Sequence, residues 1–249
     1  MEIIKYIILG FVQGLTEFFP VSSSGHLSLL QQLFGMSENA LLVSVVLHGG
    51  TLIALLVFFS KSFSAVVKER NFLAKIILVT LVTGVIGVGG KDFFESIFSS
   101  FRWVAGGWVF TGIILISTLF IKKNQKDKFS YSDALILGLV QGFAIIPGVS
   151  RAGATIVALL FLGLKKEEAF RISFLASIPA VFGALILEAK DLPLLANTSW
   201  LPLVAGFVIS FLSGLFTLTL LKKIIQQSKL HYFGYYCLVL GVVVFLFYR

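Results

Sequence analysis

LGFVQGLTEFFPVSSSG, residues 9–25, aligns without a gap with LGLVQGFAIIPGVSRAG, residues 137–153, when the sequence is shifted against itself by 128 positions. Eight of the seventeen positions are identical, including the Gln-Gly pair and the closing Ser-x-x-Gly. Two apolar segments of similar composition would share a few residues by chance, but seldom these pairs in the same order. We therefore predict a single membrane domain over 1–249, built from internal repeats at about 1–121 and 129–249.

Composition places the chain among integral membrane proteins. It has 249 residues, 57% of them hydrophobic and 13% charged, with a mean hydropathy of +0.99. A water-soluble domain of this size could not bury so much apolar side chain in its core. The net charge of +8 comes from short clusters between apolar stretches, so it does not indicate nucleic-acid binding. A single cysteine, Cys237, excludes a disulfide framework.

Apolar stretches of about 20 residues predict spanning helices. Six segments qualify: 41–60, 72–90, 103–121, 170–187, 201–221 and 232–248. Two further stretches, 3–34 and 131–163, are interrupted by the polar loops PVSSSG (20–25) and PGVSRAG (147–153). Each half is too short to span a membrane, so each stretch is predicted to be a re-entrant hairpin around a protein-lined cavity.

The predicted fold is therefore an all-α polytopic membrane protein with six transmembrane helices and two re-entrant helical hairpins. Three spans separate the hairpins, and an odd number makes the second hairpin enter from the opposite face. Such an inverted-topology repeat places ligand sites near the bilayer midplane, where the repeats meet. The two polar loops should meet there.

Lys and Arg residues between the spans predict the orientation. Fourteen of them fall on one side: Lys61, Lys68, Arg70, Lys75, Lys122, Lys123, Lys126, Lys128, Lys165, Lys166, Arg171, Lys222, Lys223 and Lys229. Five fall on the other: Lys5, Lys91, Arg102, Lys190 and Arg249. The basic side is expected to be cytoplasmic, which puts both termini outside.

Ionisable side chains in the two loops predict a functional site. The polar residues expected to converge are Gln13, Glu17, Ser22, Ser23, His26, Gln141, Ser150, Arg151 and Thr155. Placing a charged group inside a membrane costs roughly 2.5–3.5 kcal/mol or more of free energy, so its presence there indicates a functional site. A purely structural Glu17–Arg151 ion pair is the simpler alternative, but it would not explain the neighbouring hydroxyls and glycines.

Several of these residues are suited to binding phosphate. Gly25 and Gly153 permit close approach of a ligand to the backbone, and each loop precedes a helix whose free N–H groups favour anions. Arg151 offers a planar, always-charged fork for phosphate oxygens. Hydroxyl donors that would complete this phosphate site are Ser22, Ser150 and Thr155.

Reactive side chains concentrate in the first loop. Glu17 can act as a base or, with Gln13 four residues earlier, as an oxygen ligand for Mg²⁺ or Ca²⁺. His26 can transfer protons near neutral pH, and Ser23 or Ser22 could attack phosphorus if a base removes its proton. His48 is expected to lie behind the site and His231 at the membrane interface. Loop positions expected to be solvated are Glu95, Glu188, Lys190 and Asp191.

Three motifs resemble the undecaprenyl-diphosphatase (bacitracin-resistance) family of bacterial inner membranes. They are QGLTEFFPVSSSGH (13–26), PGVSRAGAT (147–155) and FRISFLASIPAVFGA (170–184), and the resemblance covers essentially the whole chain. It implies hydrolysis of a C55 lipid diphosphate to the monophosphate carrier used in cell-wall synthesis. It also implies a divalent cation and a site that opens to the periplasmic side.

We expect catalytic roles for Glu17, Ser23, His26 and Arg151, with Ser23 as nucleophile and either Glu17 or His26 accepting its proton. Direct attack by water, with Ser23 only binding phosphate, stays open, as does His26 as the nucleophile. Gln13 stands at a position where the family has Glu or Gln, and Ala152 stands where serine is usual. The first departure puts a two-carboxylate metal site in doubt, and the second shows that a hydroxyl at position 152 is not essential.

Two other functions compete with this hypothesis. A secondary transporter or lipid flippase could use the same inverted-repeat architecture, but Glu17 and Arg151 occupy non-equivalent positions of the repeats, which favours chemistry. A type 2 phosphatidic acid phosphatase would need a second His and an Asp after Ser150-Arg151, and the sequence has neither there. The expected partners are the polyprenyl diphosphate and membrane lipids; the oligomeric state, a homodimer included, stays open.

Overall fold

The computed structural model describes residues 2–36, 40–61, 69–98, 100–121, 126–190 and 199–248, and these residues contain helices but no strand. The predicted all-α class is confirmed. Several positions used above lie outside the described residues: Lys68, Lys122, Lys123, Asp191 and Arg249. The side chains of Glu95 and Lys190 lie outside them as well.

The helices follow the predicted segments closely. In chain order they are α1 (Glu2–Phe18), α2 (Ser23–Leu33), α3 (Ala40–Phe58), α5 (Arg70–Gly89), α6 (Lys91–Phe98), α7 (Phe101–Ile116), the 3-10 turn η1 (Ser117–Phe120), α8 (Tyr131–Phe143), α9 (Arg151–Phe161), α10 (Lys166–Lys190), α11 (Trp200–Gln226) and α12 (His231–Phe247). Five of the described segments are long and apolar enough to cross a membrane: α3, α5, α7 with η1, α10 and α11. Helix α12, predicted as a sixth span, is apolar but has 17 residues. The chain is thus a multi-span membrane protein.

The first interrupted stretch forms the helix pair α1–α2. Pro20 follows the end of α1, and the backbone turns through residues 19–22. The Lys5 ammonium donates a hydrogen bond to the Phe34 carbonyl oxygen at 2.8 Å, so the start of α1 lies beside the end of α2. The turn is shorter than the predicted loop 20–25, because Ser23, Ser24 and Gly25 already form the first turn of α2. Backbone N–H groups in the first turn of a helix have no hydrogen-bond acceptor within that helix.

The second interrupted stretch forms the equivalent pair α8–α9. Ser130 and Asp133 make a reciprocal capping box that starts α8, and Pro147 followed by Gly148 at φ 83° separates the two helices. The Lys126 amide donates to the Gly163 carbonyl oxygen at 3.0 Å, which closes the open end of the pair. The break spans 144–150 rather than 147–153, because Arg151 already belongs to α9.

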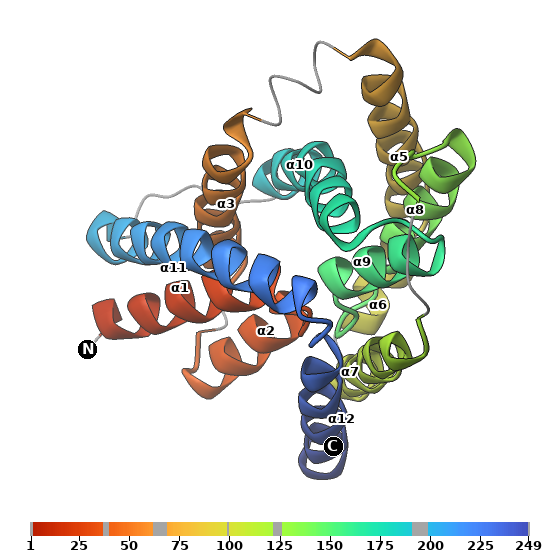
Figure 1. Ribbon diagram of the computed structural model, residues 1–249. Coiled ribbons are helices and arrows are strands. Elements are labelled where there is room, and N and C mark those ends of the chain that lie inside the picture. Colours follow the sequence, from red (N-terminus) through yellow and green to blue (C-terminus); the bar gives the residue numbers. More distant parts are fainter. Residues whose placement is uncertain are drawn as a thin grey trace.

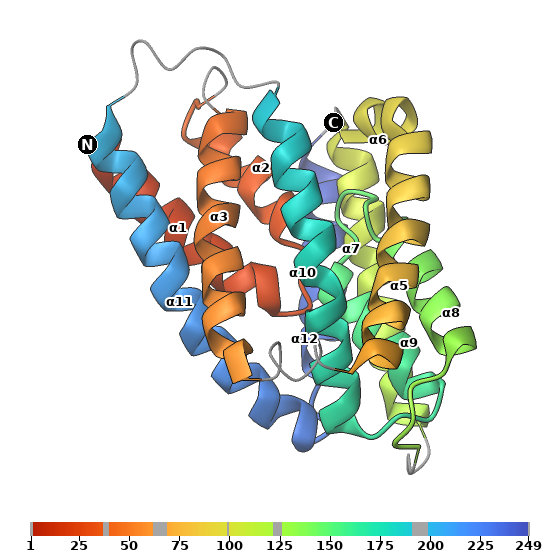
Figure 2. The ribbon, with the colours of Figure 1, turned by 90° about the horizontal axis from the view of Figure 1, so that it is seen from above.

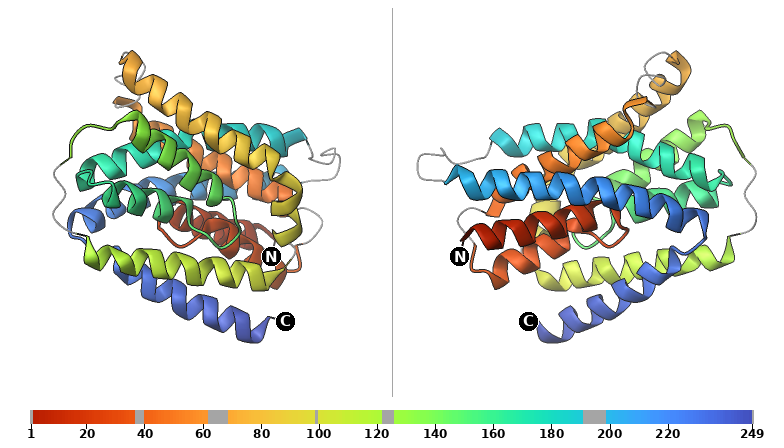
Figure 3. Two further views of the ribbon diagram at one scale, coloured as in Figure 1. Left: turned by 90° about the vertical axis from the view of Figure 1, so that its right-hand side faces the viewer. Right: turned by 60° about the vertical axis from the view of Figure 1, so that its left-hand side comes forward.

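The arrangement of these pairs can be followed in Figure 1. Helices α1, α2, α3 and α11 lie on one side, α5, α8 and α9 lie on the other, and α10 runs between them. Helices α7 and α12 pack against each other. Figure 2 shows both termini at one end of the molecule, and the α1–α2 pair opens toward that end. The α8–α9 pair opens toward the opposite end, as Figure 3 also shows.

Small residues allow α1 to lie close against α11. Gly10 faces the Gly206 backbone, and Gly14 faces Ser210 and Ser213. In a membrane, where lipid is as apolar as leucine, such small-residue seams let backbones approach and gain van der Waals contact. The seam holds the end of α1, and therefore Glu17, in a fixed position.

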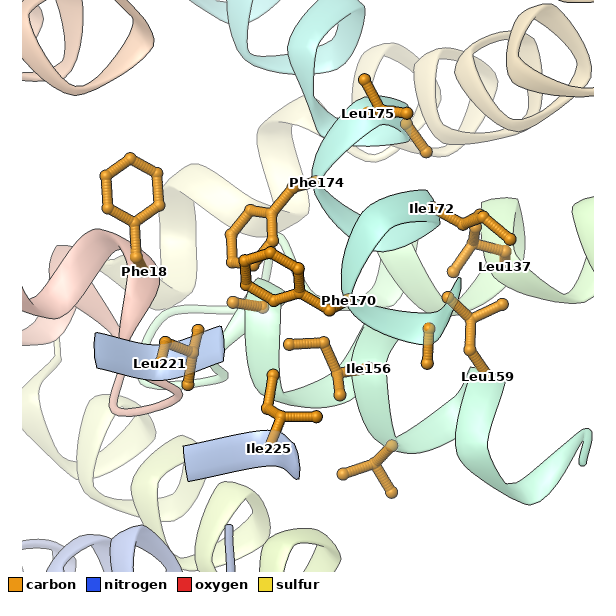
Figure 4. Packing of buried hydrophobic residues seen from close by; sticks show 14 of the residues in the cluster. Phe18, Leu137, Ile156, Leu159, Phe170, Ile172, Phe174, Leu175, Leu221 and Ile225 are labelled. Carbon is orange, nitrogen blue, oxygen red and sulfur yellow. The ribbon is translucent and has the colours of Figure 1, made fainter. Parts of the chain in front are cut away.

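An aromatic and aliphatic core lies behind the two turns (Figure 4). Phe18 packs edge-on against Phe174 with ring centroids 5.7 Å apart, and Phe170 packs on Phe174 at 5.0 Å. Figure 4 shows Ile156, Leu221 and other aliphatic side chains from α9 and α11 filling the space around these rings. The core therefore joins α1, α9, α10 and α11 directly behind the polar loops.

We expect Gly10→Ala to destabilise the protein by about 1–3 kcal/mol, because overpacking a tight contact forces the helices apart. A Cβ at this position would lie 2.3 Å from the Gly206 carbonyl oxygen. Thermal unfolding in detergent measures the effect. Gly84→Ala is the matched control, since nothing lies within 4 Å of a Cβ there. Equal stability of the two variants would contradict the close α1–α11 contact.

Candidate active site

The two turns line one polar cavity with a volume of about 210 Å³. Glu17 at the end of α1, Ser22 in the first turn and Ser23 at the start of α2 line it, as do Ser150 at the second turn and Arg151 at the start of α9. Residues from α3 and α10 complete its wall. The predicted meeting of the two polar loops is confirmed by these contacts.

Glu17 is the centre of the cavity's hydrogen bonds. Its Oε1 accepts from Arg151 Nη2 at 2.5 Å, and its Oε2 accepts from Ser23 Oγ at 2.7 Å. Gln13, one helical turn earlier on α1, donates from Nε2 to the same Oε2 at 3.2 Å. The side chain of Glu17 is only 8% exposed. A carboxylate buried this deeply needs such donors to remain ionised.

Arg151 is positioned by the first turn of α9. Ser150 caps this helix, accepting the Gly153 N–H on its Oγ at 3.1 Å, and the Ser150 amide donates to Thr111 Oγ1 at 3.0 Å. The Arg151 guanidinium lies over the Phe174 ring, 6.0 Å from its centroid. Its Nη1 is buried without a hydrogen-bond partner among the described residues. An unpaired donor of a permanent cation is suited to bind an anion.

Ser22 adopts an unusual backbone conformation at the start of α2. Its φ is 67° and its ψ is 99°, and its side chain does not cap the helix. A non-glycine residue in this region costs about 1–3 kcal/mol and persists only where neighbouring contacts enforce it. The conformation places Ser23 at the first position of α2, with its hydroxyl on Glu17.

His26 lies away from the Glu17 carboxylate. Its Nδ1 is 2.7 Å from the Ser22 carbonyl oxygen, and its Nε2 is 2.7 Å from the Tyr236 hydroxyl on α12. Gly25 packs directly against the Trp108 ring. Neither residue lines the cavity, although both were predicted to face it.

Thr155 and Gln141 are also buried outside the cavity. Thr155 Oγ1 donates to the Arg151 carbonyl oxygen at 2.7 Å and lies 2.7 Å from Ser173 Oγ. Gln141 donates to Thr83 Oγ1 on α5 at 3.2 Å. Thr155 lies one helical turn after Arg151 on α9, so its hydrogen bond stabilises the first turn of that helix, which carries Arg151. Gln141 belongs to the α5–α8 interface.

Two residues have a larger part in the site than the sequence predicted. His48 Nε2 on α3 lies 3.5 Å from Glu17 Oε2, so it contacts the carboxylate directly. Glu188 was expected in a solvated loop, but it belongs to α10 and lines the cavity. The sequence feature that indicates both residues is an ionisable side chain within, or at the end of, a long apolar segment.

The side chains can contribute to a cation site, but they do not form a complete one. No group of three His, Cys, Asp or Glu side chains capable of holding a metal occurs within the described residues. Glu17 and Glu188 both line the cavity, and Oε1 of Gln13 is buried without a partner in the described part of the chain. Mg²⁺ needs few protein ligands when substrate phosphates and water complete its shell; Glu17 and Glu188 offer carboxylate oxygens at the cavity, whereas Gln13 does not line it.

Comparison with known proteins identifies the family. Residues 6–243 match the family model described as bacitracin resistance protein BacA. The chain belongs to this family. Curated relatives named undecaprenyl-diphosphatase include proteins of Halothermothrix orenii, 41% identical, and Carboxydothermus hydrogenoformans, 40% identical; each alignment covers 98% of this chain and 97% of the relative. A relative of the same name from Methanococcus maripaludis is 39% identical, with 97% and 98% covered.

We expect Glu17→Ala to destabilise the folded protein by about 3–5 kcal/mol, because it leaves the Arg151 cation buried without its partner. Arg151 is 17% exposed in its side chain, so water replaces the carboxylate poorly. The double variant Glu17→Ala/Arg151→Ala should recover part of this loss. Unfolding of the single and double variants in detergent gives the coupling. Additive losses would show that the pair contributes little.

Proposed function

We propose that this chain is an integral-membrane phosphatase that hydrolyses undecaprenyl diphosphate to the monophosphate and inorganic phosphate. The observation that carries the proposal is the Ser23 hydroxyl, which donates to Glu17 at 2.7 Å beside the Arg151 guanidinium in one membrane-protein cavity. Relatives covering the full chain carry the name of this activity. The reaction recycles the lipid carrier of cell-wall synthesis and confers bacitracin resistance.

Ser23 is the proposed nucleophile. Its Oγ attacks the terminal phosphorus, its proton passes to Glu17, and the bond to the bridging oxygen breaks to release the lipid monophosphate. Water then hydrolyses the phosphoserine to inorganic phosphate. Glu17 is the better proton acceptor in this geometry, because it already accepts the Ser23 hydrogen bond whereas both His26 nitrogens are engaged elsewhere.

Arg151 binds the terminal phosphoryl group through its unpaired Nη1 and stabilises the charge that develops during transfer. Nη2 keeps its hydrogen bond to Glu17, so one guanidinium contacts both the proposed proton acceptor and the phosphoryl group. The backbone N–H groups at the start of α2 and α9 lie beside the same cavity and supply further donors.

A divalent cation, Mg²⁺ or Ca²⁺, completes the proposed site. Glu17, Gln13 through its unpaired Oε1, and Glu188 are the oxygen donors that would hold it together with substrate phosphates. When bound, such an ion neutralises negative charge on the diphosphate.

The finer architecture is proposed as six transmembrane helices, α12 being the sixth, and two re-entrant hairpins in an inverted repeat. Exchange of partners between the halves supports it: α1 packs mainly on α11, and its counterpart α8 packs mainly on α5. Helices α7 and α12, the last of each half, pack on each other. The opposite openings of the two helix pairs in Figure 2 agree with this symmetry.

The site is proposed to open to the outer face of a bacterial inner membrane, with both termini outside. Glu188 lines the cavity near the C-terminal end of α10, whereas Lys166 begins that helix at the lysine-rich end. Figure 2 shows that the C-terminal end of α10 points toward the end of the molecule that carries both termini. A basic end is expected in the cytoplasm, so the cavity faces the other side.

Phosphate release from undecaprenyl diphosphate by purified protein tests the activity. We expect metal-dependent release that stops with EDTA and returns with Mg²⁺. Ser23→Ala should abolish it, and Glu17→Gln should lower kcat by roughly 10²–10⁴-fold, the range for loss of a general base. Thr219→Ala is the control, because its hydroxyl is exposed and donates to the Leu215 carbonyl oxygen on α11, outside the cavity.

Two results would contradict parts of this proposal. Release that survives Ser23→Ala would assign the attack to water. Absence of release from folded wild-type protein with any divalent cation, combined with lipid translocation in vesicles, would favour the transporter or flippase.

Orientation can be tested with single cysteines in a Cys237→Ala background. Gln227 follows α11 at the lysine-rich end, and Asp92 lies in α6 at the opposite end; both are exposed. We expect a membrane-impermeant maleimide added to intact cells to label Asp92→Cys but not Gln227→Cys. The reverse labelling pattern would place the termini in the cytoplasm.

A further inference from the structure

The His26 ring contacts the Ser22 carbonyl oxygen and two aromatic residues outside the cavity, Trp108 and Tyr236. It is stacked with the Tyr236 ring at 5.8 Å and 11°, and it lies edge-on to Trp108 at 5.3 Å. Its two nitrogens contact the Ser22 carbonyl oxygen and the Tyr236 hydroxyl, each at 2.7 Å. The imidazole therefore joins the first turn to α12.

These partners define where the imidazole proton lies. A carbonyl oxygen can only accept, so Nδ1 must carry the hydrogen that reaches Ser22. In the neutral ring Nε2 is then an acceptor, and the Tyr236 hydroxyl donates to it. Both nitrogens are occupied, and neither is directed at Ser23 or Glu17.

Other contacts from the same two helices hold the same turn. Trp108 Nε1 on α7 donates to the Val21 carbonyl oxygen at 2.8 Å. Cys237, next to Tyr236 on α12, lies with its Sγ 3.7 Å from the Pro20 carbonyl oxygen. Three successive carbonyl groups, those of Pro20, Val21 and Ser22, are thus contacted by side chains.

The second repeat lacks this arrangement. Ala154 stands where a shift of 128 residues places the counterpart of His26, and Ser150 is the counterpart of Ser22. Ser150 has an ordinary φ of −79° and caps its own helix. Ser22 has φ 67° and no side-chain cap. The unusual conformation occurs in the turn that His26, Trp108 and Tyr236 hold.

We propose that Tyr236 and Trp108 are positioning residues that hold the strained Ser22 turn, Tyr236 acting through His26, and that His26 itself positions Ser23 rather than carrying a proton. The consequence for the reaction rests on the proposed phosphatase function. Ser23 directly follows Ser22, so release of the turn moves its hydroxyl from the 2.7 Å contact with Glu17. Small displacements of this kind lower kcat more than substrate affinity.

The first test compares two amides at position 26. In His26→Asn the side-chain N–H can still donate to the Ser22 carbonyl oxygen, but it cannot transfer a proton. In His26→Gln the longer side chain places its N–H near the position of Nε2 instead. We expect His26→Asn to keep kcat within about tenfold of wild type, as for loss of one hydrogen bond, and His26→Gln to fall well below it. Equal losses of roughly 10²–10⁴-fold in both folded variants would identify His26 as a proton carrier and overturn the proposal.

The second test removes only the Tyr236 hydroxyl. Tyr236→Phe keeps the stacked ring, and we expect kcat to fall about threefold to tenfold with KM unchanged. Tyr235→Phe, one position earlier, is the matched control and should have no effect, because the Tyr235 ring packs edge-on against His231 rather than against His26. An unchanged kcat in Tyr236→Phe would show that this hydroxyl does not position the turn.

¹⁵N NMR of histidine-labelled protein tests the contacts without requiring activity. The chain has three histidines, and His26→Asn assigns one signal. We expect a neutral Nδ1–H tautomer whose Nε2 signal shifts in Tyr236→Phe while Nδ1 stays constant. An Nε2–H tautomer, or no response to Tyr236→Phe, would overturn the proposed contacts even if the wild type hydrolyses the diphosphate. The expected spectrum would support these contacts even if the wild type does not hydrolyse the diphosphate.

Discussion

The contact between Glu17 and Arg151 is the interaction on which the rest of the structure depends. The two charges lie 134 residues apart in the chain and in different halves, and leaving either one buried without the other would be strongly destabilising. They meet because the break between α1 and α2 and the break between α8 and α9 lie at the same cavity. The remaining helices close around the turns, and lipid cannot satisfy the backbone groups that the breaks expose.

The Glu17–Arg151 pair is packed differently on its two sides. The α1–α11 seam uses Gly10, Gly14 and Gly206 to bring backbones close, whereas the core behind Arg151 is filled by the Phe18, Phe170 and Phe174 rings. The seam fixes the position of Glu17 along α1. The rings exclude water behind the ion pair and therefore strengthen its hydrogen bonds.

The two halves carry different chemistry on a common backbone plan. The second turn is an ordinary capped helix start that presents a permanent cation, Arg151. The first turn is strained at Ser22 and held by side chains from α7 and α12, and it presents a hydroxyl to a carboxylate. The two turns thus differ in their contacts with neighbouring helices: one presents a cation to the cavity, and the other presents a hydroxyl bonded to a carboxylate.

Sequence by itself determined the class, the helix segments and the candidate ion pair. Hydropathy, the Gly/Pro breaks and the match of 9–25 with 137–153 are local properties, and a buried charge demands a partner wherever it occurs. Only the tertiary structure decided which hydroxyls and bases face the cavity. Thr155 and His26 have the right chemistry but point to Ser173 and Tyr236, whereas Glu188 reaches the cavity from the far end of α10. The direction of a side chain depends on helix rotation and on partners distant in the chain, which residue type and spacing do not specify.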